Sequence, residues 1–187
     1  PVGRLIRRAK VTNDHGKLVV SNAYDRQEFI ASRDPNFRPI NSATGPDGCL
    51  YLVDMYRGII QEGNWVRSGS YLRDIVKEYE LEKNIGRGRI YRVEHETTKR
   101  GQQPRMLDET PAQLVAHLSH PNGWWRSEAQ KLIILHADLS VVDTLQQLAV
   151  AGRAPLGRLH AWWTLEGLSA IHSKFLQVGF RDPDPRV

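Results

Sequence analysis

Asp54, Tyr56 and Arg57 follow closely after a short apolar run, Cys49-Leu50-Tyr51-Leu52-Val53. The run predicts a strand, and side chains at the point where a strand enters a loop often bind ligands on a rigid scaffold. An arginine at such a point can bind a carboxylate, including that of a cofactor, through two parallel hydrogen bonds. The same residues can instead form an Asp–Arg pair or a tyrosine hydrogen bond that fixes the loop. The sequence leaves both interpretations open.

Arg38, which precedes Pro39, is a fourth ligand-binding candidate. It either faces a ligand or belongs to a structural ion pair. Between Arg38 and the strand lies Gly45-Pro46-Asp47-Gly48, which predicts a tight turn because proline presets φ, aspartate bonds its own backbone and the last glycine accepts a positive φ. We therefore interpret Asp47 as turn chemistry.

Two tryptophan pairs, Trp124-Trp125 and Trp162-Trp163, are candidates for partner binding. Indole rings can serve as stacking platforms for sugars or bases. Tryptophans on adjacent helices also pack against each other, and one member of each pair must then face the neighbouring helix. We expect packing for that member, and partner binding for the exposed one.

The sequence offers no complete catalytic or metal-binding motif. His117 and His120 are three residues apart, but no third ligand is near them in sequence, so we expect no metal site. There is no Gly-x-Ser-x-Gly, no phosphate-binding glycine loop and no Cys/His nucleophile pair. The lone Cys49 cannot form an intrachain disulfide. The catalytic residues, if any, stay unknown.

The charge of the chain does not favour nucleic acid as a partner. Of the 187 residues 40% are hydrophobic and the formal net charge is +5. The first 100 residues hold 18 Lys and Arg against 13 Asp and Glu, but these charges are scattered rather than aligned in a stripe. No apolar run approaches the roughly 18 residues of a membrane span, and no signal peptide opens the chain. Because the chain begins without Met and stops where a helix is expected to start, we expect both ends to be cut.

The elements that position these residues change in kind near residue 100. Up to Val93 the sequence predicts short strands bounded by Gly, Asp, Asn and Pro, such as 17–20, 28–31, 49–53 and 89–93. One helix is expected between residues 68 and 83, inside an excursion that spans about 58–88.

A polar segment at 97–109 predicts a linker, and helices are expected from residue 110 to the end. Thr110-Pro111 provides a cap and a proline at the first helical position. The predicted helices cover 124–136, 141–150 and 156–171, and a further one opens at 172–180; Ala129, Leu132, Ile133 and Leu135 are expected to point inward.

These helices repeat. Arg126, Ala129 and Ile133 recur 32 residues later as Arg158, Ala161 and Leu165. A helix pair that cannot bury its face alone is typical of a solenoid of the HEAT type, and the alternative is an irregular helical bundle. The turn "SHPNGWWR" at 119–126 corresponds to "RDPDPRV" at 181–187, about two periods later.

The strands, the turn and the return strand at 89–93 would make a propeller blade. The run "EFIASRDPNFRPINSATGPDGCLYLVDMYRGIIQ" at 28–61, "GRGRIYRV", "QLVAHLSHPNGWWR" and "RLHAWWTLEGL" together resemble the large membrane-bound dehydrogenases of planctomycetes and related bacteria. In that family a six-bladed propeller similar to glucose/sorbosone dehydrogenases precedes HEAT-like repeats and often a c-type haem domain. The resemblance implies β plus α architecture in two domains: the end of a propeller at 1–96 and HEAT-like repeats at 110–187.

The resemblance also implies a periplasmic or cell-surface location and a carbohydrate or alcohol substrate for the parent protein. It implies PQQ and calcium in the propeller, or haem c in a separate domain, with no cofactor inside this chain. Two functions are therefore expected as alternatives. One is a fragment of a quinoprotein-like sugar or alcohol dehydrogenase with a HEAT-repeat interaction region, inactive by itself. The other is a non-catalytic propeller and solenoid module that binds protein or polysaccharide.

Overall fold

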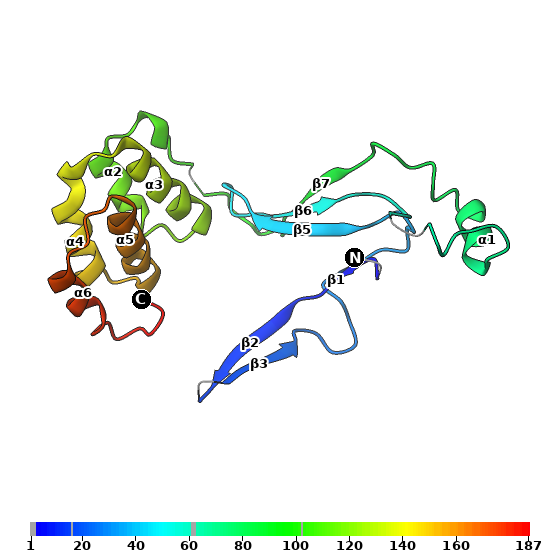
Figure 1. Cartoon of the computed structure of the whole chain (residues 1–187), viewed down its shortest axis with the longest axis horizontal. Coiled ribbons are helices and arrows are strands. Elements are labelled where there is room, and N and C mark those ends of the chain that lie inside the picture. Colours follow the sequence, from blue (N-terminus) through cyan, green and yellow to red (C-terminus); the bar gives the residue numbers. More distant parts are fainter. Residues whose placement is uncertain (1–2, 16, 61–62, 102) are drawn as a thin grey trace. The chain divides into compact units, whose positions relative to one another are not determined.

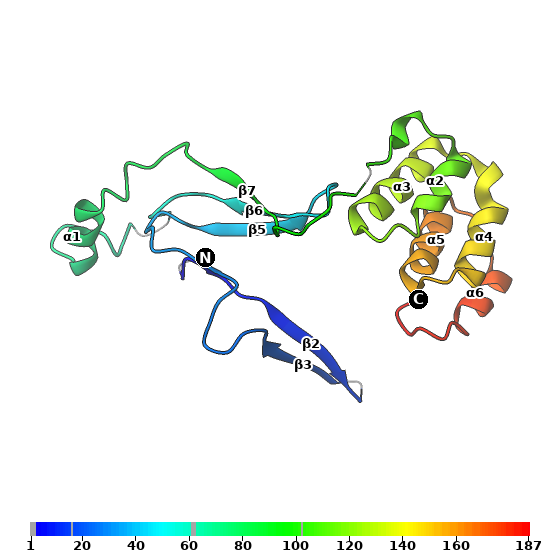
Figure 2. The ribbon, with the colours of Figure 1, turned by 180° about the vertical axis from the view of Figure 1, so that it is seen from behind.

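The computed structural model describes residues 3–15, 17–60, 63–101 and 103–187 (Figures 1 and 2). Its contacts divide the chain into two units. The strand unit consists of Pro1–Ala43 and Leu50–His95, and the helical unit consists of Glu96–Val187 together with Thr44–Cys49. The chain is therefore a mixed α and β protein. The grouping of residues 44–49 with the helices is a feature that the sequence did not indicate.

The described strands form three small sheets (Figure 1). β1 pairs with β4, β2 pairs with β3, and β6 lies between β5 and β7. Their bounds are β1 Leu5–Ile6, β2 Ala9–Asp14, β3 Lys17–Asn22, β4 Ile30–Ala31, β5 Pro39–Thr44, β6 Leu50–Asp54 and β7 Arg89–Val93. The strand predicted at 89–93 is confirmed as β7, with the same bounds.

Antiparallel pairing of β6 with β7 positions the candidate residues of the strand unit. Leu52 lies opposite Tyr91, and Asp54 lies opposite Arg89 at the end of the ladder. Because side chains alternate along a strand, Leu52 and Asp54 share one face, and both are buried. The strand therefore delivers a carboxylate, and not only apolar side chains, to the interior of the strand unit.

The hairpin of β2 and β3 is exposed at every residue. Val11 pairs with Val20, and Asn13 pairs with Leu18, so one face of the hairpin carries exposed apolar side chains. The sequence did not predict β2, because its charged and polar residues, Lys10, Asn13 and Asp14 among them, lack a strand-like apolar pattern.

The helix predicted between residues 68 and 83 is α1, Tyr71–Glu78. The Ser70 hydroxyl caps it by accepting a hydrogen bond from the Arg73 N–H at 3.3 Å. Val76 is buried, whereas Tyr71 and Tyr79 are exposed.

Five α-helices and two 3₁₀ turns are described in the helical unit (Figure 1). The helices are α2 Pro111–His117, α3 Gly123–His136, α4 Val142–Ala151, α5 Pro155–Gly167 and α6 Ser173–Gly179, and the 3₁₀ turns are Met106–Asp108 and Leu139–Val141. One apolar core joins them, with these side chains fully buried: Leu114, Leu118, Ile133, Leu145 and Leu165. Every helix in the described part of the chain is too short or too polar to cross a membrane.

Capping explains where α2 begins and α5 ends. The Thr110 hydroxyl and the Gln113 side chain form a capping box, and Pro111 takes the first helical position. The sequence predicted the cap at Thr110 and the position of Pro111, but not the contact of Gln113. α5 ends at Gly167, four residues before the predicted end, because Ser169 takes a positive φ of 54° and the Ala170 N–H turns back to the Leu165 carbonyl.

One prediction about burial in the helical unit was wrong. Leu135 is 68% exposed, because it lies on the side of α3 opposite Ile133 and away from the core. The predicted linker at 97–109 contains Met106, which is buried in the helical core. Its 3₁₀ turn therefore belongs to the helical unit.

The 32-residue register of the helices is confirmed by their arginines. Arg126 and Arg158 are each the fourth residue of their helix, α3 and α5. Arg126 Nη1 donates to the His120 carbonyl at 2.7 Å, and Arg158 Nη1 donates to the Gly152 carbonyl at 2.8 Å. Each arginine thus closes the loop that precedes its own helix, as expected from equivalent positions.

The turn before α3 is also repeated near the end of the chain. The Asn122 N–H donates to His120 Nδ1 at 2.9 Å, and the Asp184 N–H donates to Asp182 Oδ1 at 2.8 Å. Asn122 then accepts from the Trp124 N–H, and Asp184 from the Arg186 N–H, both at 3.0 Å. The two turns therefore have the same hydrogen-bond pattern, which supports the predicted correspondence of 119–126 with 181–187.

Candidate functional site

Asp54, the last residue of β6, organises the loop that follows the strand. Its side chain is 1% exposed. Its Oδ1 atom accepts the N–H of Arg38 at 2.7 Å and the N–H of Tyr56 at 2.8 Å. The Met55 N–H also donates to the Arg38 carbonyl at 3.0 Å. The carboxylate therefore joins the start of β5 to the end of β6.

The two arginine candidates donate to the same loop. Arg38 is buried, and its Nη2 atom donates to the Gly58 carbonyl. Arg57 Nε donates to the Ile59 carbonyl at 2.9 Å. Of the two interpretations left open by the sequence, these contacts favour a loop-fixing role for Arg38 and Arg57, although the partners are carbonyls rather than an aspartate.

Tyr56 forms a small cluster with Asp34 and Arg89. The Arg89 guanidinium lies over the Tyr56 ring, 3.6 Å from its centre. The hydrogen bond to Asp34 is the main cause that raises the pKa of Tyr56. Burial alone would raise the pKa of Asp34, but hydrogen bonds from Asn36 and Tyr56 and the charge of Arg89 hold it below its ordinary value. The cluster keeps Asp34 anionic and Tyr56 protonated at neutral pH.

The backbone of this loop is strained at Tyr56, and contacts with neighbouring side chains stabilise the strained conformation. Tyr56 has a φ of 47°, a conformation that bulky residues rarely adopt. The bond from its N–H to Asp54 and the stacking of Arg89 hold it there. Gly58 is required for a different reason, since a Cβ atom at this position would lie 2.7 Å from the Leu81 side chain.

Two buried oxygen atoms of the site have no donor among the described residues: Asn36 Oδ1 and Asp54 Oδ2. The Asn36 side chain donates from Nδ2 to Asp34 Oδ1 at 3.3 Å, so its amide oxygen faces away from that bond. Buried acceptors without a partner are rare, and each requires an explanation. The site at the end of β6, formed by Asp34, Asn36, Arg38, Asp54, Tyr56 and Arg89, therefore contains two buried acceptors without a donor among the described residues. These six residues include no nucleophile paired with a base.

In the helical unit, Trp125 of the first tryptophan pair and Asn122 hold the turn at Gly45–Gly48. Trp125 Nε1 donates to the Pro46 carbonyl at 3.0 Å, and Asn122 Nδ2 donates to the Gly45 carbonyl at 2.9 Å. Within the turn, Asp47 accepts the Cys49 N–H at 3.1 Å and Gly48 has a φ of 82°, as predicted. Trp124, at 41% exposed, is the more accessible member of its pair.

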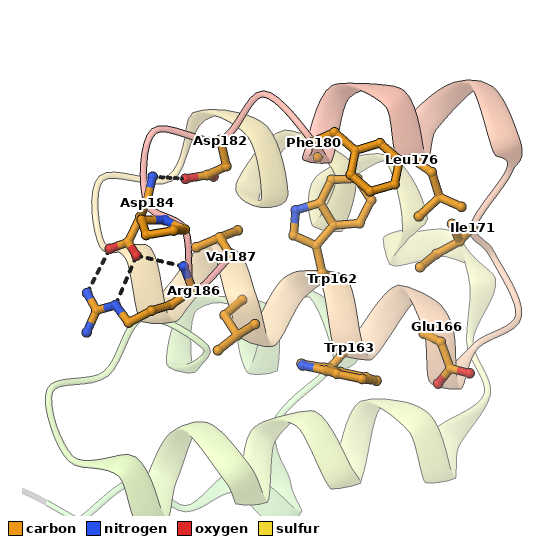
Figure 3. A pocket seen from close by; sticks show the side chains of 13 residues that line it. Trp162, Trp163, Glu166, Ile171, Leu176, Phe180, Asp182, Asp184, Arg186 and Val187 are labelled. Carbon is orange, nitrogen blue, oxygen red and sulfur yellow. Dashed lines mark hydrogen bonds and ion pairs between the residues drawn. The ribbon is translucent and has the colours of Figure 1, made fainter. Parts of the chain in front are cut away.

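The second pair lines a pocket of about 710 Å³ between α5, α6 and the last turn of the chain (Figure 3). Trp162 is buried and packs on Phe175, with ring centres 4.6 Å apart. Trp163 is 56% exposed and Phe180 is 86% exposed. As predicted, one member of the pair packs inside and the other faces solvent.

Most charges around this pocket are already neutralised. Arg158 forms two hydrogen bonds with Asp182, at 2.6 and 2.7 Å, and this pairing holds the pKa of Asp182 below its ordinary value. Hydrogen bonds from Arg186 lower the pKa of Asp184 to about 2. Glu166, at the opposite rim in Figure 3, has no ion-pair partner in the described part of the chain.

His117 and His120, the closely spaced pair of the sequence, each contact a polar neighbour. His117 Nε2 lies 2.8 Å from Glu109 Oε2, and His120 accepts the Asn122 N–H. Among the residues that the structure describes, no three His, Cys, Asp or Glu side chains come together in a group that could hold a metal ion.

The family model called Domain of unknown function (DUF7133) matches residues 1–97, just over half of the 187 residues. The chain belongs to the DUF7133 family. Comparisons with curated proteins and with solved structures found no match.

The DUF7133 match contains the whole site at the end of β6, from Asp34 to Arg89, whereas the aromatic pocket lies outside it. The sequence did not predict three members of the site at the end of β6: Asp34, Asn36 and Arg89. Asp34 and Asn36 stand in an Asp-Pro-Asn run, which is a turn signal that could have been noticed. Arg89 carries no such signal, because only the pairing of β6 with β7 brings it to Tyr56.

Proposed function

We propose that this chain is a non-catalytic binding module whose helical unit docks a protein. The observation that carries this proposal is the pocket of about 710 Å³ with exposed Trp163 and Phe180 at its edge. Monomeric proteins seldom leave large aromatic side chains gathered in the open unless they bind something there. Aromatic residues are also enriched where proteins bind one another.

The proposal includes a HEAT-like solenoid for the helices and the end of a propeller for the strands. The equivalent contacts of Arg126 and Arg158 support the first part. The family resemblance of residues 28–61 and the turn between β5 and β6 support the second. In a solenoid each repeat contacts its neighbours and presents an extended surface, which suits protein docking.

A second candidate function is a contribution to a periplasmic or cell-surface sugar or alcohol dehydrogenase. The buried acceptors Asn36 Oδ1 and Asp54 Oδ2, which have no donor in the described chain, favour it. The residues present do not by themselves fit PQQ or calcium, since Arg38 and Arg57 donate to backbone carbonyls and no described carboxylate cluster could hold a metal. We therefore derive no catalytic step, and haem c would belong to another domain.

Photo-crosslinking in cells that express the native protein tests the binding function. A photoreactive phenylalanine analogue replaces Phe180, which is 86% exposed. The same analogue at Leu139, which is 62% exposed and outside the pocket, is the matched control. We expect a discrete protein adduct from position 180 and none from position 139. Equal labelling from both positions, or none from position 180, would contradict the proposal.

A further inference from the structure

The hairpin of β2 and β3 separates charged from uncharged side chains (Figure 1). Its strands pair in register from Ala9 opposite Asn22 to Asp14 opposite Lys17. Side chains alternate between the two faces of a strand, and residues opposite each other share a face. All three charged residues of the two strands therefore lie on one face, together with Thr12 and Val19. The other face is uncharged and holds Val11, Leu18 and Val20.

Of the two outer edges of this hairpin, the edge of β3 is the less protected. Among the described strands, β2 is the only neighbour of β3. β2 carries Lys10 near its start and Asp14 at its end, whereas β3 carries only Lys17, at its first position. Charged residues protect an edge strand against the addition of another strand. A two-stranded hairpin is also marginal by itself, and a third or fourth strand would stabilise it.

We propose that β3 pairs antiparallel with β3 of a second copy of this chain, about a two-fold axis at Val19. In this register Val19 lies opposite Val19 of the second copy, Leu18 lies opposite Val20, and Lys17 lies opposite Ser21. The contact is self-complementary, as a two-fold axis requires, because the Leu18–Val20 pair occurs twice. It places three apolar pairs across the axis, and no like charges lie directly opposite each other.

Other registers of the same two strands fit less well. A shift by one residue would put Val19 opposite Val20, so that the uncharged face of one copy would lie beside the charged face of the other. A register centred on Val20 places Leu18 opposite Asn22, and a register centred on Leu18 places Val19 opposite Lys17. Only the register centred on Val19 keeps the faces aligned and also pairs apolar residues throughout its centre.

The resulting four-stranded sheet should form reversibly. Each cross-strand pair contributes little by itself, so we expect a monomer in dilute solution, where the hairpin stands alone, and a dimer at high concentration. The sedimentation coefficient of the purified chain should therefore increase with concentration. This inference is independent of the docking proposed for the helical unit, because it concerns the strand unit alone.

Two lysine variants test the position of the axis. Val19→Lys places two like charges directly opposite each other and should weaken dimerisation at least about ten-fold. Thr12→Lys is the matched control, because Thr12 is exposed and lies opposite Val19 on the same face of the hairpin, but on β2. It should leave dimerisation unchanged. An equal loss in both variants would overturn the pairing through β3.

A charge-reversed pair separates loss of the contact from loss of the hairpin. Val19→Lys and Val19→Glu should each dimerise poorly alone, whereas their mixture should form a mixed dimer, because opposite charges then face each other across the axis. Native mass spectrometry distinguishes the mixed dimer by its mass. A mixture that stays monomeric at concentrations where the unchanged chain dimerises would overturn the proposed register.

Disulfide trapping gives the geometry directly. Val19→Cys should form a dimer linked by a disulfide under mild oxidation, because two opposed residues bring their Cα atoms to about 5 Å. Val11→Cys should not, since the two β2 strands would lie on the outside of the sheet, about 14 Å apart. The native Cys49 is buried. A link from position 11 but none from position 19 would overturn the proposal. A chain that stays monomeric at every concentration would also overturn it, and an adduct from position 180 would then still support the binding function.

Discussion

Asp54, in the site at the end of β6, uses one side-chain oxygen to hold the loop and leaves the other without a partner among the described residues. Its Oδ1 atom accepts two backbone N–H groups, whereas its Oδ2 atom is buried with no donor among the described residues. A buried carboxylate oxygen without a partner is costly, unless another group supplies a donor or a cation. Substitutions at this position separate the role of each oxygen.

Asp54→Ala should destabilise the strand unit, because it leaves the Arg38 and Tyr56 amides without an acceptor, at about 1–3 kcal/mol for each. Asp54→Asn keeps Oδ1 and removes the unpaired charge, so its effect should be smaller. Hydrogen exchange at these two amides measures the difference: protection should be lost in the alanine variant and kept in the asparagine variant. Asp25→Asn, at an exposed carboxylate, is the control. An asparagine variant as damaged as the alanine variant would show that the charge itself is needed.

His160 predicts how the helical unit responds to pH. Burial is the main cause that lowers the pKa of His160, and the charge of Arg126 adds to it. As pH falls below about 7, the unfolded chain takes up a proton at this residue before the folded chain does. Stability should therefore be highest above the unfolded pKa and decrease between pH 7 and 5. His160→Gln should flatten this dependence in thermal unfolding followed by circular dichroism, and the exposed His172→Gln should not. An unchanged slope in His160→Gln would contradict the assignment.

At the residue scale, the sequence predicted the site residues that lie at the end of a strand, but not the contacts that they form. Asp54, Tyr56 and Arg57 were visible because an apolar strand precedes them. Their hydrogen-bond partners were not visible, because Arg89 reaches Tyr56 only through strand pairing. Local pattern therefore locates the site, and tertiary pairing decides its chemistry.

At the element scale, the two equivalent arginines allow a matched comparison of helices α3 and α5. Arg126 donates to two loop carbonyls, those of His120 and Pro121, whereas Arg158 also pairs with Asp182 through two hydrogen bonds. Lysine cannot reproduce a two-point contact with a carboxylate. Arg158→Lys should therefore lower the Tm of the helical unit more than Arg126→Lys does.

Acid provides a second test of the same pair. Because Arg158 lowers the pKa of Asp182, the stabilisation is present above the unfolded pKa of about 3.9 and is lost as pH falls through the lowered value. The difference in Tm between the two lysine variants should therefore shrink as pH falls below about 4. Equal losses of Tm at neutral pH would mean that the carboxylate pair adds nothing to the loop contacts.

The helices were easier to predict than the strands for a physical reason. Helix signals are local, as in the Thr110–Gln113 capping box and the proline that follows Thr110. β2 has no such signal, because it is fixed by pairing with β3 rather than by its own residues. The same argument applies to the turn at Gly45–Gly48, whose shape was predicted and whose contact with Trp125 was not.

At the scale of the whole molecule, we predict no dehydrogenase turnover by this chain alone. Catalytic groups must be held to about half an ångström by surrounding residues. Here the strand unit contributes sheets of two and three strands in its described part, and its arginines bind their own backbone. Purified chain with quinone, calcium, an artificial electron acceptor and a series of aldoses and alcohols should not reduce the dye. Saturable reduction that depends on the chain would show that a complete site lies within these residues.

The two units should also differ in stability, with the strand unit unfolding first. A continuous core of fully buried side chains supports the helical unit, and its contacts are mostly between neighbouring helices. The strand unit has few buried apolar residues, and its β2–β3 hairpin is exposed throughout, which makes an isolated hairpin marginal. Val11, Leu18 and Val20 on one face of this hairpin are exposed, so they add little burial of apolar surface to its stability.

Urea unfolding monitored by hydrogen exchange should therefore show two transitions. Amides of β2 and β3 should exchange almost freely before any denaturant is added, because local opening of an exposed hairpin costs little free energy. Amides of α3 and α5 should stay protected until the second transition. Leu145→Ala, in the helical core, should move only the second transition, by about 2–5 kcal/mol. A single transition shared by β6 and α5 would show instead that the two units stabilise each other, and that the strand unit depends on the helices for its fold.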